Sequence, residues 1–536
     1  MPRMVWNKRT AFMLAAIGSA VGLGNLWRFP YIAYENGGGA FLVPYFIALL
    51  TTGIPLLIGE YILGKRSGAG APFSFKKISP RFEWVGWWAI LTGFGIVTYY
   101  TVVMSWAWFY LAKSPWIPWA DNAKAYFFGE VLKLSDGPMQ LGGLVWPLVL
   151  GSLITWVLCF FIIRKGTSTV GKVVKWTVPL PYILLLILLV HGLARDGALE
   201  GLIYYLTPNW EILSQASTWL AAYGQIFFSL SLGFGIMIAY ASYLKKEEDV
   251  SWQATVCGLA NSATEFFAGF VVFSIIGALA AVLNANIADV AAAGPGLAFV
   301  TFPWALAELP LAPFFSLVFF AALLTLGIDS AFSLIEAVVA GLQDKMPNVS
   351  RLKLVISVCV VGFIVSLLFA TKAGLYWLDI VDHWLNSYGL VGVGLATALL
   401  IGVVLKTSTL VREINEYTIK PVGKFWEVSV AVITPVVLTI TLIFALKGEL
   451  ITNYGDYPAR ALAIGGWGVW GLTVVLAILL QSHRSKWFFL SVFTLAAVTM
   501  ILALTYSTAF AMGIVGTVIL AGGLIWMWMI AKRSRR

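Results

Sequence analysis

Charged side chains inside long apolar stretches could do chemistry in this sequence of 536 residues. An ionisable group in a hydrocarbon environment is costly, so each one needs a partner or a function. Asp329 stands beside a hydroxyl in Thr325-Leu-Gly-Ile-Asp329-Ser330, and such oxygen ligands suit a hard cation such as Na⁺. A hydrogen bond between helices is the alternative for Asp329, and Glu60 and Glu336 fit structural roles better. The set comprises Arg28, Glu60, Glu265, Asp329, Glu336 and Asp382.

Two clusters of glycine and polar residues interrupt apolar stretches. The first is Gly18-Ser-Ala-Val-Gly22-Leu-Gly24-Asn25, and the second is Ser229-Leu-Ser231-Leu-Gly233-Phe-Gly235. Close helix packing is the usual reason for glycine in membrane helices. Here each cluster falls in the first span of a block of five, which points to an inverted repeat with discontinuous helices. Unwound segments expose carbonyl oxygens for cations and helix N-termini for an anionic group.

The composition defines the class of protein that must position these residues. Hydrophobic residues make up 60% of the chain and charged residues only 11%, whereas soluble domains carry about 25% charged residues. We therefore predict an all-α polytopic membrane protein and exclude a soluble domain, a disordered chain and a disulfide scaffold. The net charge of +10 fits basic cytoplasmic loops, so no nucleic-acid partner is expected. The first apolar stretch is expected to be a retained helix, because it exceeds signal-peptide length.

Enzyme chemistry has no support in the sequence. Cys159, Cys257 and Cys359 each lie in an apolar segment, which favours neither a disulfide framework nor a metal site. The three histidines are scattered, and no nucleotide-binding loop or nucleophile motif stands out. We expect a protein without catalytic residues.

Fourteen membrane spans are predicted from the apolar runs. With the N-terminus in the cytoplasm, most Lys and Arg residues fall in the inside segments, which supports an even number of spans and cytoplasmic termini. The apolar segment 284–311 is interrupted by Ala-Gly-Pro-Gly and is expected to be a re-entrant or capping loop. The spans are 9–36, 40–64, 84–112, 144–163, 170–194, 217–244, 252–283, 312–342, 353–371, 375–405, 425–446, 463–481, 487–506 and 509–531.

Three motifs resemble the neurotransmitter:sodium symporter family, in particular its prokaryotic amino-acid members. Ala20-Val-Gly-Leu-Gly-Asn25-Leu-Trp-Arg28-Phe-Pro30 with Glu35-Asn-Gly-Gly-Gly-Ala-Phe41 resembles its first helix. Gln225-Ile-Phe-Phe-Ser229-Leu-Ser-Leu-Gly-Phe-Gly235 with Ala241-Ser-Tyr243 resembles its sixth, and Thr325 to Ser330 its eighth.

The resemblance covers roughly residues 1–480 and implies a twelve-helix core, so spans thirteen and fourteen depart from the family. The implied organisation is a core at 1–482, with a first repeat at 1–195, a second at 217–407 and the last two core spans at 408–482. An extra hairpin and basic tail follow at 483–536.

Two sodium sites are implied by the resemblance. The first would use the Ala20 carbonyl, Asn25, Ser229, Asn261 and the substrate carboxylate. An interhelical hydrogen bond is the alternative for Asn261 alone. The second would use the carbonyls of Gly18, Val21 and Leu326 with Asp329 and Ser330, a pair that is more like the animal members.

The implied substrate pocket has a glycine, Gly22, where monoamine carriers of the family have an aspartate. Glycine leaves room for a substrate carboxylate, to which the Tyr100 hydroxyl would donate. Ordinary packing explains Ile96 and Leu334 equally well. Because the lining has no charge beyond the sodium ligands, a neutral, mainly hydrophobic amino acid is expected. The lining residues are Ser19, Gly22, Gly24, Ile96, Tyr100, Phe228, Ser231, Phe234, Ser330 and Leu334.

The resemblance also implies two gates. Arg28 and Asp382 would close the outer vestibule as a pair, with Phe234 as a lid. Arg3 and Asp344 would pair at the cytoplasmic mouth with help from Trp6 and Tyr243. Exposed ion pairs are weak, which suits gates that must open.

Glu265 stands where chloride-dependent family members have a serine that helps to hold chloride. Its carboxylate would supply the negative charge itself, so no chloride requirement is expected. Glu265 could also take up a proton on the return step, which would give Na⁺/H⁺ exchange. The alternative is a hydrogen bond between Glu265 and Glu60.

The expected function is Na⁺-coupled import of a neutral amino acid by alternating access, in the cell inner (plasma) membrane. The expected partners are the amino acid, Na⁺ and the lipid bilayer, in a monomer or a homodimer. A channel and a transport-dead sensor or scaffold are alternatives from other classes. Within transport, the alternative substrate is another small carboxylate such as an ω-amino acid or betaine.

Overall fold

The computed structural model describes residues 5–6, 8–290 and 294–482. Across these ranges the secondary structure is helical, and the only extended pairing is an isolated antiparallel bridge between Leu144 and Thr371. Predicted spans thirteen and fourteen, and the gate residue Arg3, lie outside the described residues.

Helices stand at each of the first twelve predicted spans. The first half comprises α1 (Arg9–Ala20), α2 (Leu23–Trp27), α3 (Phe29–Glu35), η1 (Gly38–Phe41), α4 (Leu42–Ala48), η2 (Leu49–Gly53), α5 (Ile54–Ser67), α6 (Ala71–Ile78), η3 (Pro80–Phe82), α7 (Glu83–Lys113), α8 (Ala123–Ala125), η4 (Tyr126–Val131), α9 (Trp146–Ile163), α10 (Thr167–Thr177), α11 (Pro179–Leu193), α12 (Ala198–Leu206) and η5 (Trp210–Ser214). The second half comprises α13 (Ala216–Ser229), α14 (Ile236–Ala241), α15 (Val250–Leu283), α16 (Ile287–Val290), α17 (Gly294–Gly296), η6 (Leu297–Thr301), α18 (Phe302–Ala307), α19 (Ala312–Lys345), α20 (Arg351–Ser366), α21 (Gly374–Trp384), η7 (Leu385–Leu390), α22 (Val391–Leu399), η8 (Leu400–Val404), α23 (Thr407–Asn415), α24 (Lys424–Val428), η9 (Ser429–Ile433), α25 (Thr434–Ile451), η10 (Tyr454–Asp456), α26 (Ala459–Ala461), η11 (Leu462–Gly468) and α27 (Val469–Leu480).

Length and hydropathy confirm the predicted fold class. In the part of the chain that the structure describes, nine helices are long and apolar enough to cross a membrane, or ten when the bent pair α1 and α2–α3 counts as one span. The remaining two predicted spans, six and nine, contain α13, with 14 residues, and α20, with 16 residues. Both helices are shorter than the nine long apolar helices. The chain is therefore an all-α polytopic membrane protein.

Both predicted breaks are present. The first span bends by 51° between α1 and α2, where Val21 and Gly22 have extended backbone. The sixth span is broken between α13 and α14, where Ser231, Gly233 and Gly235 have φ values of 55°, 79° and 73°. Glycine adopts this left-handed region without the steric cost that a β-carbon brings. The glycine clusters therefore unwind the two helices and do more than pack them.

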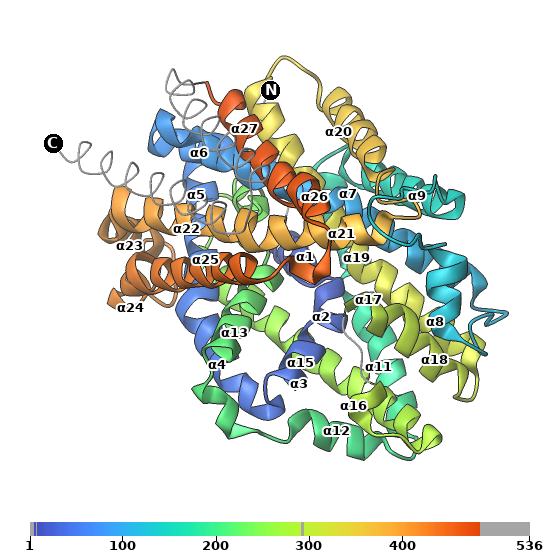
Figure 1. The fold of residues 1–536 in the computed structure, drawn as a ribbon. Coiled ribbons are helices and arrows are strands. Elements are labelled where there is room, and N and C mark those ends of the chain that lie inside the picture. The colour runs from blue at the N-terminus through green and yellow to red at the C-terminus, as the bar shows by residue number, and fades with distance from the viewer. Residues whose placement is uncertain (1–4, 7, 291–293, 483–536) are drawn as a thin grey trace.

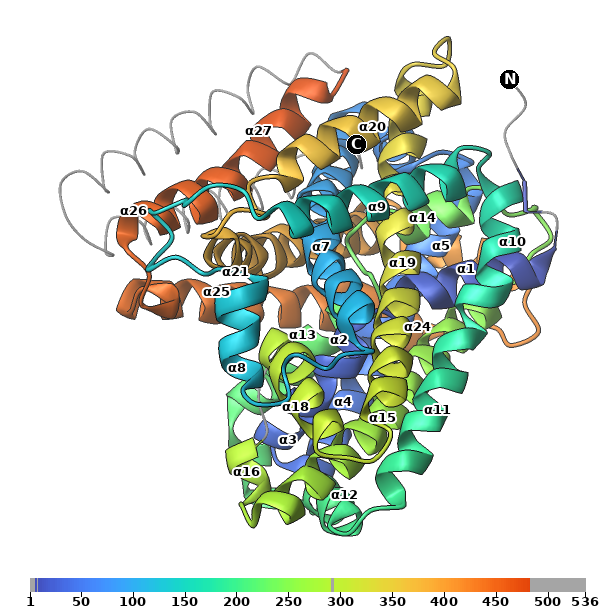
Figure 2. The same cartoon turned by 90° about the vertical axis from the view of Figure 1, so that its right-hand side faces the viewer.

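The two broken spans lie at the centre of the bundle. In Figure 1, α1 and α2 lie near the middle of the molecule, and α1 packs against α10, α15 and α19. Two of the longest helices, α7 and α19, pack extensively against each other. Figure 2 shows α12 and α16 together at one end of the molecule. The unwound segments are thus held between long, continuous helices.

The segment between spans seven and eight packs over the first and third spans. The Phe299 ring contacts the rings of Trp27 and Trp106, and the Tyr110 hydroxyl donates to the Phe299 carbonyl at 2.8 Å. Trp119 Nε1 donates to the Pro303 carbonyl at 3.0 Å. This arrangement agrees with the capping loop expected from the sequence.

Candidate functional site

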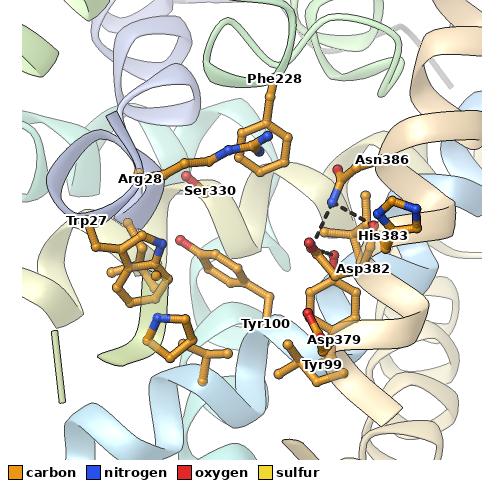
Figure 3. A pocket seen from close by; sticks show the side chains of 18 of the residues that line it. Trp27, Arg28, Tyr99, Tyr100, Phe228, Ser330, Asp379, Asp382, His383 and Asn386 are labelled. Carbon is orange, nitrogen blue, oxygen red and sulfur yellow. Dashed lines mark hydrogen bonds between the residues drawn. The ribbon is translucent and has the colours of Figure 1, made fainter. Parts of the chain in front are cut away.

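A cavity of about 720 Å³ runs from the two helix breaks toward α21 and the segment after α25. All ten residues predicted to bind substrate line it, together with Ala20, Asn25 and Ser229 from the first predicted sodium site. The breaks contribute main-chain atoms and small side chains, and α7 and α19 contribute Tyr100 and Ser330 (Figure 3). Segments far apart in the sequence therefore meet around one space.

A chain of hydrogen bonds joins three predicted ligands of the first sodium site. Asn25 Nδ2 donates to Asn261 Oδ1 at 2.8 Å, and Asn261 Nδ2 donates to Ser229 Oγ at 3.0 Å. The Gly22 N–H donates to Asn25 Oδ1 at 2.8 Å, so the asparagine also supports the break in the first span. The side chains are buried, and their amide and hydroxyl oxygens are hard ligands of the kind that Na⁺ takes.

Asp329 lies beside Gly18, near the end of α1 that precedes the same break. A β-carbon on Gly18 would stand 2.6 Å from Asp329 Oδ2, so the carboxylate touches the end of α1. The other oxygen, Oδ1, is buried and has no hydrogen-bond partner among the described residues. The Ser330 hydroxyl donates to the Ser19 carbonyl at 3.3 Å. An unpaired oxygen of a buried carboxylate is costly unless a cation balances it, so the predicted second sodium set fits a cation chemically.

Among the described residues, no group of three or more His, Cys, Asp and Glu side chains is arranged so that it could hold a metal ion.

The space beside Gly22 is small and offers a free donor. A β-carbon on Gly22 would stand 2.8 Å from Ser330 Oγ and 3.6 Å from the Tyr100 hydroxyl oxygen. That hydroxyl is buried without a partner in the described structure. A group that accepts its hydrogen bond would therefore remove an unsatisfied donor from the cavity wall.

The two residues predicted to form the outer gate, Arg28 and Asp382, lie on the cavity wall and form no ion pair with each other in the described structure. The Arg28 guanidinium stacks over the Phe228 ring, 4.6 Å from its centroid. Asp382 accepts hydrogen bonds from the Tyr99 hydroxyl at 2.5 Å and from Asn386 Nδ2 at 2.7 Å. Figure 3 shows Arg28 directed toward Phe228 and Asp382 beside Asn386, and no ion pair within the described ranges joins Arg28 to Asp382. The cavity is open on this side.

Two residues predicted to assist the inner gate, Trp6 and Tyr243, are joined by a hydrogen bond. Trp6 donates from its main-chain N–H to the Tyr243 carbonyl at 3.1 Å and from Nε1 to the Tyr240 carbonyl at 2.9 Å. The Tyr243 hydroxyl donates to Glu336 at 3.0 Å, and Glu336 forms an ion pair with Arg351. The structure thus gives Glu336 the structural partner that was expected. Nearby, Asp344 accepts a hydrogen bond from the Gly70 N–H at 2.6 Å.

Glu265 is fully buried among donors from two other spans. Its carboxylate accepts hydrogen bonds from the Tyr45 hydroxyl and from Gln225 Nε2, the latter at 2.6 Å. Glu60 instead accepts the Gly233 N–H at 2.9 Å and supports the break in span six. No hydrogen bond joins Glu265 to Glu60 among the described residues, so the structure does not contain the bond that this alternative requires.

Sequence reasoning missed several partners of the predicted residues. Tyr45 and Gln225 at Glu265, and Tyr99 at Asp382, come from distant segments, so no local pattern reveals them. Asn386 is different, since it follows Asp382 by one helical turn and that spacing was visible.

A bundle with two centrally broken spans that meet at a cavity has the architecture of a secondary transporter. The model of the sodium:neurotransmitter symporter family matches residues 3–126 and 119–488, and the chain belongs to this family. The resemblance seen in the sequence is confirmed, and members of the family are transporters rather than enzymes.

The relatives include an uncharacterized sodium-dependent transporter of Methanocaldococcus jannaschii, which is 38% identical over 90% of this chain and 99% of its own length. The human sodium- and chloride-dependent GABA transporter 2 is 36% identical over 86% of this chain and 83% of its own length. The sodium- and chloride-dependent glycine transporter 2 of Xenopus laevis is 34% identical over 86% of this chain and 66% of its own length.

Proposed function

We propose that this sodium-dependent symporter imports a neutral, mainly hydrophobic amino acid. The single observation that carries the proposal is the buried, unpartnered Tyr100 hydroxyl beside Gly22. A free α-carboxylate fits this space, because it can accept the hydrogen bond and can also complete a cation shell at Asn25 and Ser229. The aromatic and aliphatic residues Phe228, Phe234, Ile96 and Leu334 suit an apolar side chain.

Two sodium ions accompany the substrate in this proposal. The first binds at Ala20, Asn25, Ser229 and Asn261, next to the substrate carboxylate. The second binds at Gly18, Val21, Leu326, Asp329 and Ser330. The linked side chains of the first set and the unpartnered oxygen of Asp329 support these assignments.

Alternating access follows from the two gates. Substrate enters through the open side, Arg28 then meets Asp382, and the contacts of Trp6 and Tyr243 release on the other side. We place both termini in the cytoplasm of a cell whose plasma (inner) membrane holds the protein, and we assign 1–195 and 217–407 as its two repeats. Residues 408–482 complete the core, and 483–536 form the additional hairpin and tail.

Chloride is not required in this proposal, although the GABA and glycine transporters above are chloride-dependent by name. Tyr45 and Gln225 already donate to the Glu265 carboxylate, so the donors and the space that an anion would use are occupied. Protonation of Glu265 on the return step would give Na⁺/H⁺ exchange.

An ω-amino acid or betaine is the second candidate substrate, and the GABA transporter among the relatives favours it. Sodium-dependent uptake of labelled amino acids into proteoliposomes separates the candidates. Uptake of L-leucine that exceeds uptake of GABA and betaine is expected. Preferred uptake of GABA or betaine would overturn the substrate assignment, and sodium-independent flux would contradict coupling.

A further inference from the structure

The outer half of span ten, α21, is bound on one side by the connection between spans three and four. The Tyr376 hydroxyl donates to the Ser135 carbonyl at 2.8 Å, and Trp377 Nε1 donates to the Pro138 carbonyl at 2.9 Å. This helix carries the gate residue Asp382. Its position therefore depends on segments outside the binding site.

On its other side, α21 is bound by the end of span eleven and the connection that follows. The hydroxyls of Tyr454 and Tyr457 donate to Asp379 Oδ1 and Oδ2 at 3.0 and 2.9 Å. His383 Nε2 lies 2.7 Å from Glu449 Oε1, and the Tyr454 ring stacks on the imidazole with centroids 3.8 Å apart. We call these five residues the outer clamp.

The turn that carries the two tyrosines has a specific geometry. Gly455 has a φ of +58°, and a β-carbon there would stand 2.7 Å from the Tyr457 ring. A larger residue would strain the backbone and displace Tyr457. The turn therefore allows two tyrosines, three positions apart, to reach both oxygens of one carboxylate.

The outer clamp and the gate share one helical turn. Asp379, Asp382 and His383 are three and four positions apart on α21, so they lie on one face, and all three line the cavity (Figure 3). Asp382 is held in turn by Tyr99 on α7 and by Asn386. Partners from α7, η7, α25 and the segment after α25 thus hold one turn of α21.

We propose that the outer clamp consists of positioning residues, which hold α21 so that Asp382 meets Arg28 when the outer pathway closes. The inference rests on the proposed function, because it takes Arg28 and Asp382 as the outer gate. A carboxylate held in place needs no ordering at the moment of closure, and this lowers the entropic cost of forming the gate. The clamp residues act through Asp382.

The first test removes two hydroxyl groups in the double variant Tyr454→Phe/Tyr457→Phe. A cysteine in place of Ser387, which lines the cavity, reports whether a water-soluble thiol reagent can enter from outside. In the unaltered clamp, L-leucine with saturating Na⁺ should protect this cysteine. In the double variant we expect most of the protection to be lost and the KM for L-leucine to rise several-fold, with a smaller change in kcat.

The matched control is Tyr31→Phe. Tyr31 also lines the cavity, and its hydroxyl donates to Glu35 at 3.3 Å, away from the clamp. Protection and KM should remain as in the parent protein. A double variant that behaves like this control overturns the proposal.

A second pair of variants separates positioning from general destabilisation. Glu449→Gln retains an acceptor for His383 and should keep protection and KM near the parent values, whereas Glu449→Ala should resemble the double tyrosine variant. Equal behaviour of the two substitutions would contradict the role of the His383–Glu449 contact. If the parent reporter is not protected at all, the proposed gate fails, and this outcome is distinct from a failure of the clamp alone.

Discussion

Two buried oxygen atoms without hydrogen-bond partners in the described structure are central to the proposed binding of ions and substrate. Asp329 Oδ1 and the Tyr100 hydroxyl are both buried and unpartnered in the described structure, and the two side chains adjoin Gly18 and Gly22 in the broken first span. Buried polar groups are normally hydrogen-bonded, so such exceptions mark positions where a ligand completes the site. Substitution of a single residue should therefore change the binding of ions or substrate.

Asp329→Ala should abolish sodium-dependent substrate binding, because it removes the only carboxylate that the protein contributes to either proposed sodium site. At least a tenfold loss of sodium affinity is expected, which corresponds to about 1.4 kcal/mol or more. Scintillation-proximity binding of labelled L-leucine across a sodium titration measures it. Unchanged sodium dependence in Asp329→Ala would mean that the second site is misassigned.

Tyr100→Phe should weaken binding of amino acids, because it removes the donor assigned to the substrate carboxylate. A hydrogen bond to a charged group contributes about 1.5–3 kcal/mol, so at least a tenfold increase in the dissociation constant is expected. Decarboxylated amines should compete poorly with their parent amino acids in the unaltered protein. Competition assays with tryptophan and tryptamine check this, and strong competition by tryptamine would refute recognition of a carboxylate.

Glu265→Ser should make uptake chloride-dependent, since it removes the fixed negative charge and leaves Tyr45 and Gln225 as donors for an anion. The unaltered protein should transport equally well when chloride is replaced by gluconate. Uptake into proteoliposomes in the two salts measures both effects. Loss of native uptake in gluconate would disprove the substitution of carboxylate for chloride, and so would a serine variant that is indifferent to chloride.

At the scale of elements, the breaks in spans one and six determine where the residues that line the cavity meet. Gly233 lies in the left-handed region, and a β-carbon there would stand 2.9 Å from the Leu390 carbonyl oxygen. Its N–H is held by Glu60. The unwound segment of span six is thus fixed by conformation, by close packing and by a buried carboxylate.

Gly233→Ala should destabilise the protein and reduce substrate binding. The left-handed conformation alone costs a residue with a β-carbon about 1–2 kcal/mol, and the contact with Leu390 adds to it. Thermal unfolding in detergent and binding of L-leucine measure the two effects. Gly224→Ala is the control, because a β-carbon at this position in α13 meets nothing within 4 Å. Equal melting temperatures for the two variants would show that the break tolerates a side chain.

At the scale of the whole molecule, the sequence predicted most of the architecture, because lipid imposes both the length and the polarity of a span. Gly22 and Gly235 revealed the breaks, since glycine and polar residues are conspicuous in apolar runs. The short helices α6 and α12 were not predicted, because they are too short to span a membrane. The partners of Asp382 and Glu265 also escaped prediction, since Tyr99 and Tyr45 lie far from them in the sequence. Which gate is open depends on small displacements between packed helices, and these leave no periodic signal.

The two ends of the pathway should open in turn. Ser242 is buried at the predicted inner gate, next to Tyr243, so a cysteine there should react with a water-soluble thiol reagent only when that end opens. Its labelling should rise under conditions that protect the outer cysteine at position 387. The experiment requires a background in which the three native cysteines are replaced by alanine. Simultaneous labelling at both positions would indicate a channel rather than a carrier.

The unwound main chain has a consequence for how this architecture diversifies. Several of the proposed ion ligands are carbonyl oxygens of Gly18, Ala20, Val21 and Leu326, which every amino acid possesses, whereas the apolar wall of the cavity is made of side chains such as Ile96 and Leu334. A mutation can therefore change the shape of the substrate cavity and leave the main-chain ion ligands in place. Substrate specificity can thus diverge during evolution while sodium coupling is retained, which offers a physical reason why sodium-dependent relatives of this chain carry names as different as glycine and GABA transporter.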